Sequence, residues 1–143
     1  MAPYSPQRGA VADLRQELGW SARIRFRDAP AAIDWLTQTL GFEEVAVHQG
    51  DDGTVHHAEL AFEGEVIMLG SASDGSDGRM AGDFGPAVTY LATDAVDTLY
   101  ERAQKAGAEL EYELRDTDYG SHEFAARDAE GNVWSVGTYR PKV

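Results

Sequence analysis

Two side chains that could move a proton or hold a metal ion, His57 and Glu59, stand two residues apart. They fall within residues 55–62, which we predict to be a strand, and positions i and i+2 of a strand share a face. A carboxylate beside an imidazole can abstract a proton next to a carbonyl group. Glu59 and His57 are therefore the candidate catalytic residues, and the simpler alternative is that they hydrogen-bond each other at the rim of a cleft.

A divalent metal ion is the other use of these donors. His122 lies in a second predicted strand, residues 122–127, and with His57 and Glu59 it would complete a three-ligand site. Such a site needs three or four converging donors, and thiolate ligands are excluded because the chain has no Cys. We expect no metal cofactor, with His57, Glu59 and His122 as the weak alternative ligands.

The elements that must position these groups occur twice along the chain. Asp28 recurs as Asp94 at an offset of 66 residues, and Gly64 recurs as Gly131 at an offset of 67. Each copy is typical of a strand, a helix and three further strands. The first copy predicts strands at 20–27, 43–48, 55–62 and 65–70, and the second at 87–92, 109–114, 122–127 and 132–139.

The predicted helices follow the first strand of each copy. Asp28 and Asp94 are good N-cap residues, and Gly41 and Gly107 end the two helical patterns. Apolar side chains at helical spacing should face the core between these ends. The expected buried stripes are Ile33, Leu36 and Leu40 in the first helix, and Val96, Leu99, Ala103 and Ala106 in the second.

Length and composition limit the classes of partner. The chain has 143 residues and a net charge of −13, which repels nucleic acid and anionic membrane surfaces. Its apolar runs are too short to span a bilayer, and residues 1–19 lack the apolar segment of a secretory signal. We therefore expect a cytoplasmic protein. Residues 1–19 form an extension and residues 20–141 one domain, with modules at about 20–70 and 86–141 joined by a connection at 71–85.

Several local motifs resemble the vicinal oxygen chelate superfamily, which includes glyoxalases, extradiol dioxygenases and bleomycin-resistance proteins. The resemblance covers about residues 20–141 and rests on the motifs at 27–33, 40–42, 57–60, 119–120 and 128–134. It implies an α+β fold of two tandem βαβββ modules, whose curved mixed sheets surround a shared cleft, commonly in a homodimer. Metal-dependent members use four positions that fall here on Ser21, Glu59, Val88 and Ser135, and only Glu59 is a carboxylate.

The same resemblance predicts which side chains face the cleft. Parity with the carried-over positions gives an apolar floor, a basic wall and one carboxylate. Arg25 would recognise an anionic or polar group of a ligand, unless Arg23 and Arg25 simply pair with Glu59 and other acids. Tyr119, in a turn bounded by Gly, could cap the cleft or donate from its hydroxyl. The predicted ligand-binding residues are Arg23, Arg25, His57, Glu59, Met68, Tyr119, Val133 and Ser135.

Three functions remain open at this point. The favoured one is a metal-free protein that binds a small, partly aromatic or hydrophobic molecule and sequesters a toxic natural product. The second is an enzyme of the same superfamily, either a metal-dependent lyase, isomerase or dioxygenase or a metal-free catalyst that uses Glu59 as its base. The third is a regulatory or structural dimer with a vestigial cleft. A fold alone does not choose among them.

Overall fold

The computed structural model describes residues 21–78, 81 and 85–142. The predicted extension, residues 1–19, and part of the predicted connection lie outside the described residues. The first module contains β1 (Arg23–Phe26), α2 (Ala29–Leu40), β2 (Glu43–Gln49), β3 (Val55–Phe62) and β4 (Glu65–Ser71). The second contains β5 (Val88–Ala92), α3 (Val96–Lys105), β6 (Glu109–Asp116), β7 (His122–Arg127) and β8 (Val133–Gly137).

The two modules form four-stranded mixed sheets with the same topology. The strand orders are β1-β4-β3-β2 and β5-β8-β7-β6. The pairs β1–β4 and β5–β8 are parallel, and the remaining neighbours are antiparallel. This confirms the predicted α+β fold of two tandem βαβββ modules. The repeat in the sequence is therefore a repeat in space.

The first helix begins and ends as predicted. The Asp28 carboxylate accepts a hydrogen bond of 3.1 Å from the backbone N–H of Ala31, and Pro30 occupies the first turn. Gly41 adopts the left-handed conformation, with φ 76°, that closes the helix. These three residues fix the length of α2 and the place where β2 leaves it.

The second helix corrects one prediction, because Asp94 does not cap it. The α3 helix begins at Val96, and the Asp94 side chain is 92% exposed. Thr93 is fully buried, and its hydroxyl accepts a hydrogen bond of 3.0 Å from the backbone N–H of Ala95. The α3 helix therefore has no side-chain N-cap, and the Thr93 hydroxyl instead holds the backbone of Ala95, the residue before the helix.

The core lies between the helices and the sheets. Both predicted stripes are buried except for Ala106, which is exposed because it follows the last turn of α3. Trp134 is fully buried at the junction of the modules, with its ring 6.5 Å from Trp35 and 5.9 Å from Phe42 between centroids. Because Trp35 and Phe42 belong to the first module and Trp134 to the second, the modules share one core.

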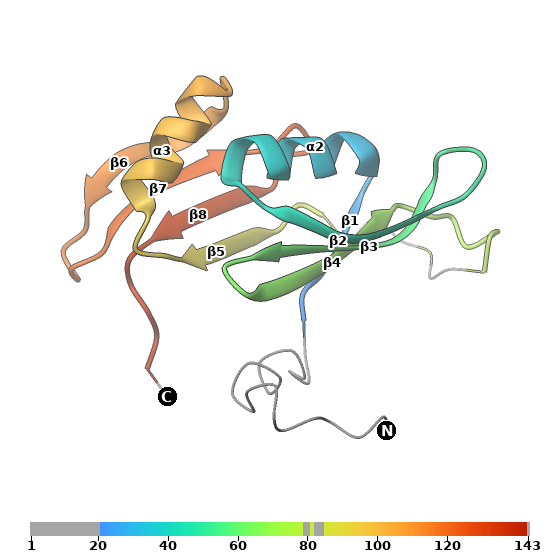
Figure 1. Cartoon of the computed structure of the whole chain (residues 1–143), viewed down its shortest axis with the longest axis horizontal. Helices are drawn as coiled ribbons and strands as arrows, with labels where there is room; N and C mark the ends of the chain where they lie inside the picture. Colours follow the sequence, from blue (N-terminus) through green and yellow to red (C-terminus); the bar gives the residue numbers. More distant parts are fainter. Residues whose placement is uncertain (1–20, 79–80, 82–84, 143) are drawn as a thin grey trace.

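Both helices lie on the same side of the two sheets (Figure 1). Alternating side chains of each strand point toward them: Phe26 in β1 and Trp134 in β8 are buried, whereas Arg25 and Ser135 are half-buried. We call the side of each sheet that faces away from the helices its open face. Within the described residues, no helix is long and apolar enough to cross a membrane.

The second module holds the C-terminal end of α2. Arg102 on α3 donates a hydrogen bond of 3.0 Å from Nε to the carbonyl of Gln38 and another of 3.0 Å from its terminal nitrogen to the carbonyl of Thr37. Carbonyl groups in the last turn of a helix have no partner within the helix. The guanidinium therefore satisfies two of them and favourably meets the negative end of the helix dipole.

Each module contributes one glutamate that contacts the chain at the start of the other module's helix. The Glu130 carboxylate, in the turn between β7 and β8, accepts hydrogen bonds of 2.6 Å from the N–H of Arg27 and 2.9 Å from the N–H of Asp28. Glu63, in the turn between β3 and β4, accepts one of 2.5 Å from the hydroxyl of Thr93. These contacts hold the two sheets at a fixed position relative to each other.

Candidate functional site

The open face of the first sheet carries most of the predicted ligand-binding residues. In the parallel pair β1–β4, Arg23 is opposite Met68 and Arg25 is opposite Gly70. In the antiparallel pair β3–β4, Glu59 is opposite Met68. Cross-strand partners share a face, so Arg23, Arg25, Glu59 and Met68 lie together, and His57 joins them two residues before Glu59. These five side chains therefore lie on one face, as their parity along the strands predicts, and their binding of a ligand stays a prediction.

His57 and Glu59 are in direct contact. Nε2 of His57 lies 2.8 Å from Oε2 of Glu59, and their side chains are 36% and 38% exposed. The His48 ring stacks on His57 with 6.1 Å between centroids. A carboxylate and an imidazole that are hydrogen-bonded and reachable from solvent can pass a proton to or from a bound molecule.

His122 is not part of this site. It shares the parity of Phe124, which contacts Tyr100 of α3, and so it faces the helix side of its sheet. Its Nε2 lies 2.7 Å from Asp97 and its Nδ1 lies 2.7 Å from Asp116. The predicted three-ligand site of His57, Glu59 and His122 is therefore wrong, because His122 lies on the helix side of the second sheet, whereas His57 and Glu59 lie on the open face of the first.

The positions used by metal-dependent relatives offer no replacement. The Ser21 hydroxyl donates a hydrogen bond of 2.6 Å to the carbonyl of Val66, and Val88 has no donor atom in its side chain. Among the described residues, no group of three or more His, Asp or Glu side chains is placed to hold a metal ion. In the described part of the chain, these side chains therefore do not fit a metal centre.

The contacts of His122 predict a pH-dependent property. The hydrogen bond that the ring donates to Asp97, followed by the one to Asp116, raises the pKa of the His122 imidazole above its ordinary value. Because the folded pKa is raised, the charged imidazole stabilises the fold below the unfolded pKa, and this contribution is lost as the pH rises through the folded pKa. NMR titration should show the His122 ring titrating above about 6.5, and Asp97→Asn should lower its pKa. Asp118→Asn is the control, and an unraised pKa in the wild type would contradict the assignment.

The open face of the second sheet carries the other predicted residues. Ser135 is opposite Tyr90 on β5 and Ala125 on β7, and Val133 is opposite Val88 and Arg127 in the same way. Val133 and Ser135 therefore lie on the open face, as parity predicts. The hydroxyl of Tyr119, whose ring is largely exposed, donates a hydrogen bond of 3.1 Å to Glu123.

Glu123 belongs to the candidate site but was not among the residues predicted from the sequence. Its side chain is on the open face of β7, opposite Gly137, yet the residue is only 4% exposed because other side chains cover it. The carboxylate accepts hydrogen bonds of 3.2 Å from Tyr112, 3.1 Å from Tyr119 and 2.9 Å from Ser121. We call this group the tyrosine cluster, formed by Tyr90, Tyr112, Tyr119, Ser121, Glu123 and Ser135.

Burial and charge set the acidity of the tyrosine cluster. Burial, assisted by the nearby Glu123 charge, raises the pKa values of Tyr90 and Tyr112. Both phenols therefore stay protonated at neutral pH. The Arg115 guanidinium lies 3.7 Å above the centre of the Tyr112 ring, a cation–π contact that covers this phenol from one side. One feature of the sequence indicates that Glu123 lies on the open face: it has the parity of Ala125 and Arg127, opposite to the buried Phe124.

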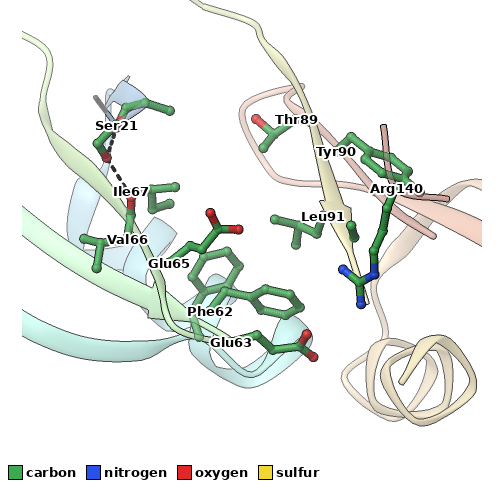
Figure 2. A pocket seen from close by; sticks show the side chains of 13 residues that line it. Ser21, Phe62, Glu63, Glu65, Val66, Ile67, Thr89, Tyr90, Leu91 and Arg140 are labelled. Atoms are coloured by element: carbon green, nitrogen blue, oxygen red, sulfur yellow. Dashed lines mark hydrogen bonds between the residues drawn. The ribbon is translucent and has the colours of Figure 1, made fainter. Parts of the chain in front are cut away.

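A groove of about 240 Å³ lies where the two modules meet (Figure 2). Aromatic and aliphatic side chains form its floor, and charged ones lie at its sides, with Glu65 on β4 across from Arg140. Val66 and Tyr90 line the groove and also belong to the open faces of their sheets. The groove therefore connects both open faces. Its other lining residues include Phe42, Phe62, Glu63, Ile67 and Leu91, and none of the eight predicted ligand-binding residues lines it.

A duplicated βαβββ unit with polar groups on the open faces of both sheets defines a protein of the vicinal oxygen chelate class. The family described as the Glyoxalase/Bleomycin resistance protein/Dioxygenase superfamily matches residues 19–136, and this chain belongs to that family.

Several relatives and solved structures are similar to the chain. The uncharacterized protein Mb0911c of Mycobacterium bovis is 30% identical, over 87% of this chain and 85% of that protein. The uncharacterized protein Rv0887c of Mycobacterium tuberculosis is 28% identical, over 92% and 80%. The crystal structure of TioX from Micromonospora sp. ML1 superposes with a TM-score of 0.72 at 26% identity, over 85% of this chain and 100% of that one. A superfamily member from Sphaerobacter thermophilus has a TM-score of 0.60 at 21% identity, over 85% and 98%.

Proposed function

We propose that this protein binds a small, partly aromatic or hydrophobic molecule against the open faces of its sheets and sequesters it, without a catalytic metal. The observation that carries the proposal is the groove of about 240 Å³ whose lining residues Val66 and Tyr90 join the two open faces. An apolar floor with a few polar groups around it is the usual composition of a small-molecule site. Sequestration of a toxic natural product needs only such a complementary surface.

Arg23 and Arg25 give the first open face its selectivity in this proposal. The chain has 12 Lys and Arg against 25 Asp and Glu, yet two arginines lie on the same face of β1, with Arg23 opposite Met68 and Arg25 opposite Gly70. A guanidinium presents a planar fork of donors that fits carboxylate, sulfonate or carbonyl oxygens. Arg25, which is half-buried, would hold the anionic or polar end of the ligand while Met68 contacts its apolar part.

A second copy of the chain would complete the cleft. Val66, Val88 and Tyr90 lie on the open faces and are 39%, 77% and 37% exposed. A homodimer that covers these side chains would enclose the ligand and remove the apolar surface from water. We place the protein in the cytoplasm, because a chain without Cys suits a reducing compartment.

Anilinonaphthalene sulfonate, an aromatic dye with one anionic group, tests the proposal. We expect saturable binding by the wild type, measured by dye fluorescence, and a loss of affinity of about tenfold in Arg25→Gln, because a charge-assisted hydrogen bond disappears. Lys105→Gln removes the same charge from the exposed end of α3 and should bind like the wild type. Equal affinity of Arg25→Gln and the wild type would exclude anion recognition, and the absence of saturable binding would overturn the proposal.

Metal-free catalysis is the second candidate, favoured by the 2.8 Å contact between His57 and Glu59. Glu59 would take a proton from carbon next to a carbonyl, and His57 would hold the carboxylate in place. Exchange of the carbon-bound protons of dihydroxyacetone for deuterium distinguishes the two functions. Exchange by the wild type and none by Glu59→Gln would indicate an enzyme, and no exchange by either would favour binding alone.

A further inference from the structure

The tyrosine cluster has a direction of hydrogen bonding that is set by its one carboxylate. Glu123 is buried, and as a carboxylate it can only accept. The hydroxyl hydrogens of Tyr119 and Ser121 must therefore point to it, across 3.1 Å and 2.9 Å. Tyr112, at 3.2 Å from the same carboxylate, has a choice of partners, because its oxygen also lies 2.9 Å from that of Ser135.

The charge of Glu123 resolves that choice. A hydrogen bond to an ionised acceptor is roughly twice as strong as one between neutral groups, so Tyr112 donates to Glu123. Its oxygen then accepts the hydrogen of Ser135. The Ser135 oxygen is left with its lone pairs as the outward end of a three-residue chain on the open face.

Two backbone contacts fix the remaining hydroxyl groups. The carbonyl of Tyr139 can only accept, so the Tyr90 hydroxyl donates to it over 2.7 Å. The N–H of Tyr139 can only donate, and it reaches the Ser121 oxygen over 3.3 Å, which agrees with a Ser121 hydrogen that points to Glu123. Every hydroxyl hydrogen of the cluster is thus directed into the protein.

We propose that the open face of the second sheet presents hydrogen-bond acceptors to the cleft and takes the part of a ligand that donates, in particular an ammonium or amide N–H group. Ser135 is half-buried, and Tyr90 and Tyr119 are 37% and 62% exposed as whole residues, so a ligand on this face can contact all three. This face also carries two cations: Arg127 is paired with Glu109 and Glu111, and Arg115 lies over the Tyr112 ring. This inference rests on the proposed binding function and adds the chemical class of one end of the ligand.

The two open faces then offer complementary groups for the two ends of a ligand. Arg23 and Arg25 offer donors from the first sheet, whereas Ser135, Tyr90 and Tyr119 offer acceptor oxygens from the second. A molecule that bridges them would carry an anionic or carbonyl group at one end and an N–H group at the other, as peptides and amino-acid derivatives do.

Two probes with the same phenethyl body and opposite charge test the proposal. Phenethylamine ends in an ammonium group, and phenylpropionate ends in a carboxylate. Each is titrated into the full-length, nitrogen-15-labelled protein, and binding is read from the backbone shifts of Ser135, Tyr90 and Tyr119. We expect the amine to bind about tenfold more tightly than the acid. Glu123→Gln should abolish this preference, because an amide can donate to the hydroxyls and reverse their direction.

Two further variants separate the site from general charge and from misfolding. Glu113→Gln removes one exposed carboxylate from β6 and should keep the preference for the amine. Ser135→Ala keeps Glu123 in place and should weaken the amine about fivefold by removing one acceptor. Equal loss of preference in Glu113→Gln and Glu123→Gln, or tighter binding of the acid, would overturn the proposal. Shifts by neither probe would also overturn it, while dye binding that depends on Arg25 would leave the proposed function standing.

Discussion

Replacing Asp128 by Ala should lower the free energy of unfolding by about 3 kcal/mol. The Asp128 carboxylate is nearly buried and accepts a hydrogen bond of 3.0 Å from the indole N–H of Trp134. It also accepts bonds of 3.0 Å from the backbone and the side-chain amide of Asn132, and one of 2.9 Å from the N–H of Glu130. The substitution would leave these buried donors without partners at the junction of the two modules.

Urea denaturation followed by tryptophan fluorescence measures this loss, since Trp134 reports on the same region. Asp118→Ala is the matched control, because this aspartate lies exposed in the turn between β6 and β7 and should change stability by less than about 0.5 kcal/mol. Asp128→Asn should fall between the two, because the amide keeps one acceptor oxygen. Wild-type stability in Asp128→Ala would show that water replaces the carboxylate at no cost.

Gly137→Ala should cost about 2 kcal/mol through overpacking and displace the tyrosine cluster. A Cβ atom at position 137 would lie 2.7 Å from the Tyr90 hydroxyl, 2.9 Å from the Ser121 hydroxyl and 3.0 Å from Cβ of Glu123. At least the first two of these side chains would have to move, and the hydrogen bond between Tyr90 and the carbonyl of Tyr139 would be strained or broken. Urea denaturation gives the energy, and loss of the amine preference gives the functional effect.

A double-mutant cycle separates this clash from other effects of the methyl group. Tyr90→Phe removes the oxygen nearest to the added Cβ, so Gly137→Ala should be less destabilising in Tyr90→Phe than in the wild type. The coupling should reach at least about 0.5 kcal/mol. Additive effects of the two substitutions would mean that Tyr90 moves aside freely and that the close approach at Gly137 does not hold the cluster together.

Much of the first open face could be predicted from the sequence, because a strand alternates its side chains with a period of two. The bounds of β3 and β7 match the predicted residues. Alternation, counted from the positions that the family resemblance carries over, placed Arg25 and Glu59 on the face opposite to Phe26 and Leu60. Such local rules need no knowledge of the partner strand. The same rule excludes the predicted metal site of His57, Glu59 and His122, since His122 shares the parity of the buried Phe124.

The tyrosine cluster could not be predicted in this way, because its contacts join side chains that are far apart in the sequence. Tyr112 comes from β6, where the register shifts on both sides of this residue, so alternation loses its phase there. Tyr119 comes from a turn, and Tyr90 meets Tyr139 across 49 residues. The prediction that Asp94 caps α3 is wrong for a related reason. The backbone N–H of Ala95 bonds to the Thr93 hydroxyl, whose burial depends on the folded protein.

The two glutamates that reach across the modules occupy equivalent places in the repeat. Glu63 and Glu130 both lie in the turn before the last strand of their unit, at the offset of 67 residues, and each contacts the start of the other unit's helix. The contact of Arg102 with the end of α2 has no such twin, because Leu36 stands at the corresponding place 66 residues earlier. The two halves of the repeat are therefore unlike partners at this point, because only the second module supplies a guanidinium to the end of the other module's helix.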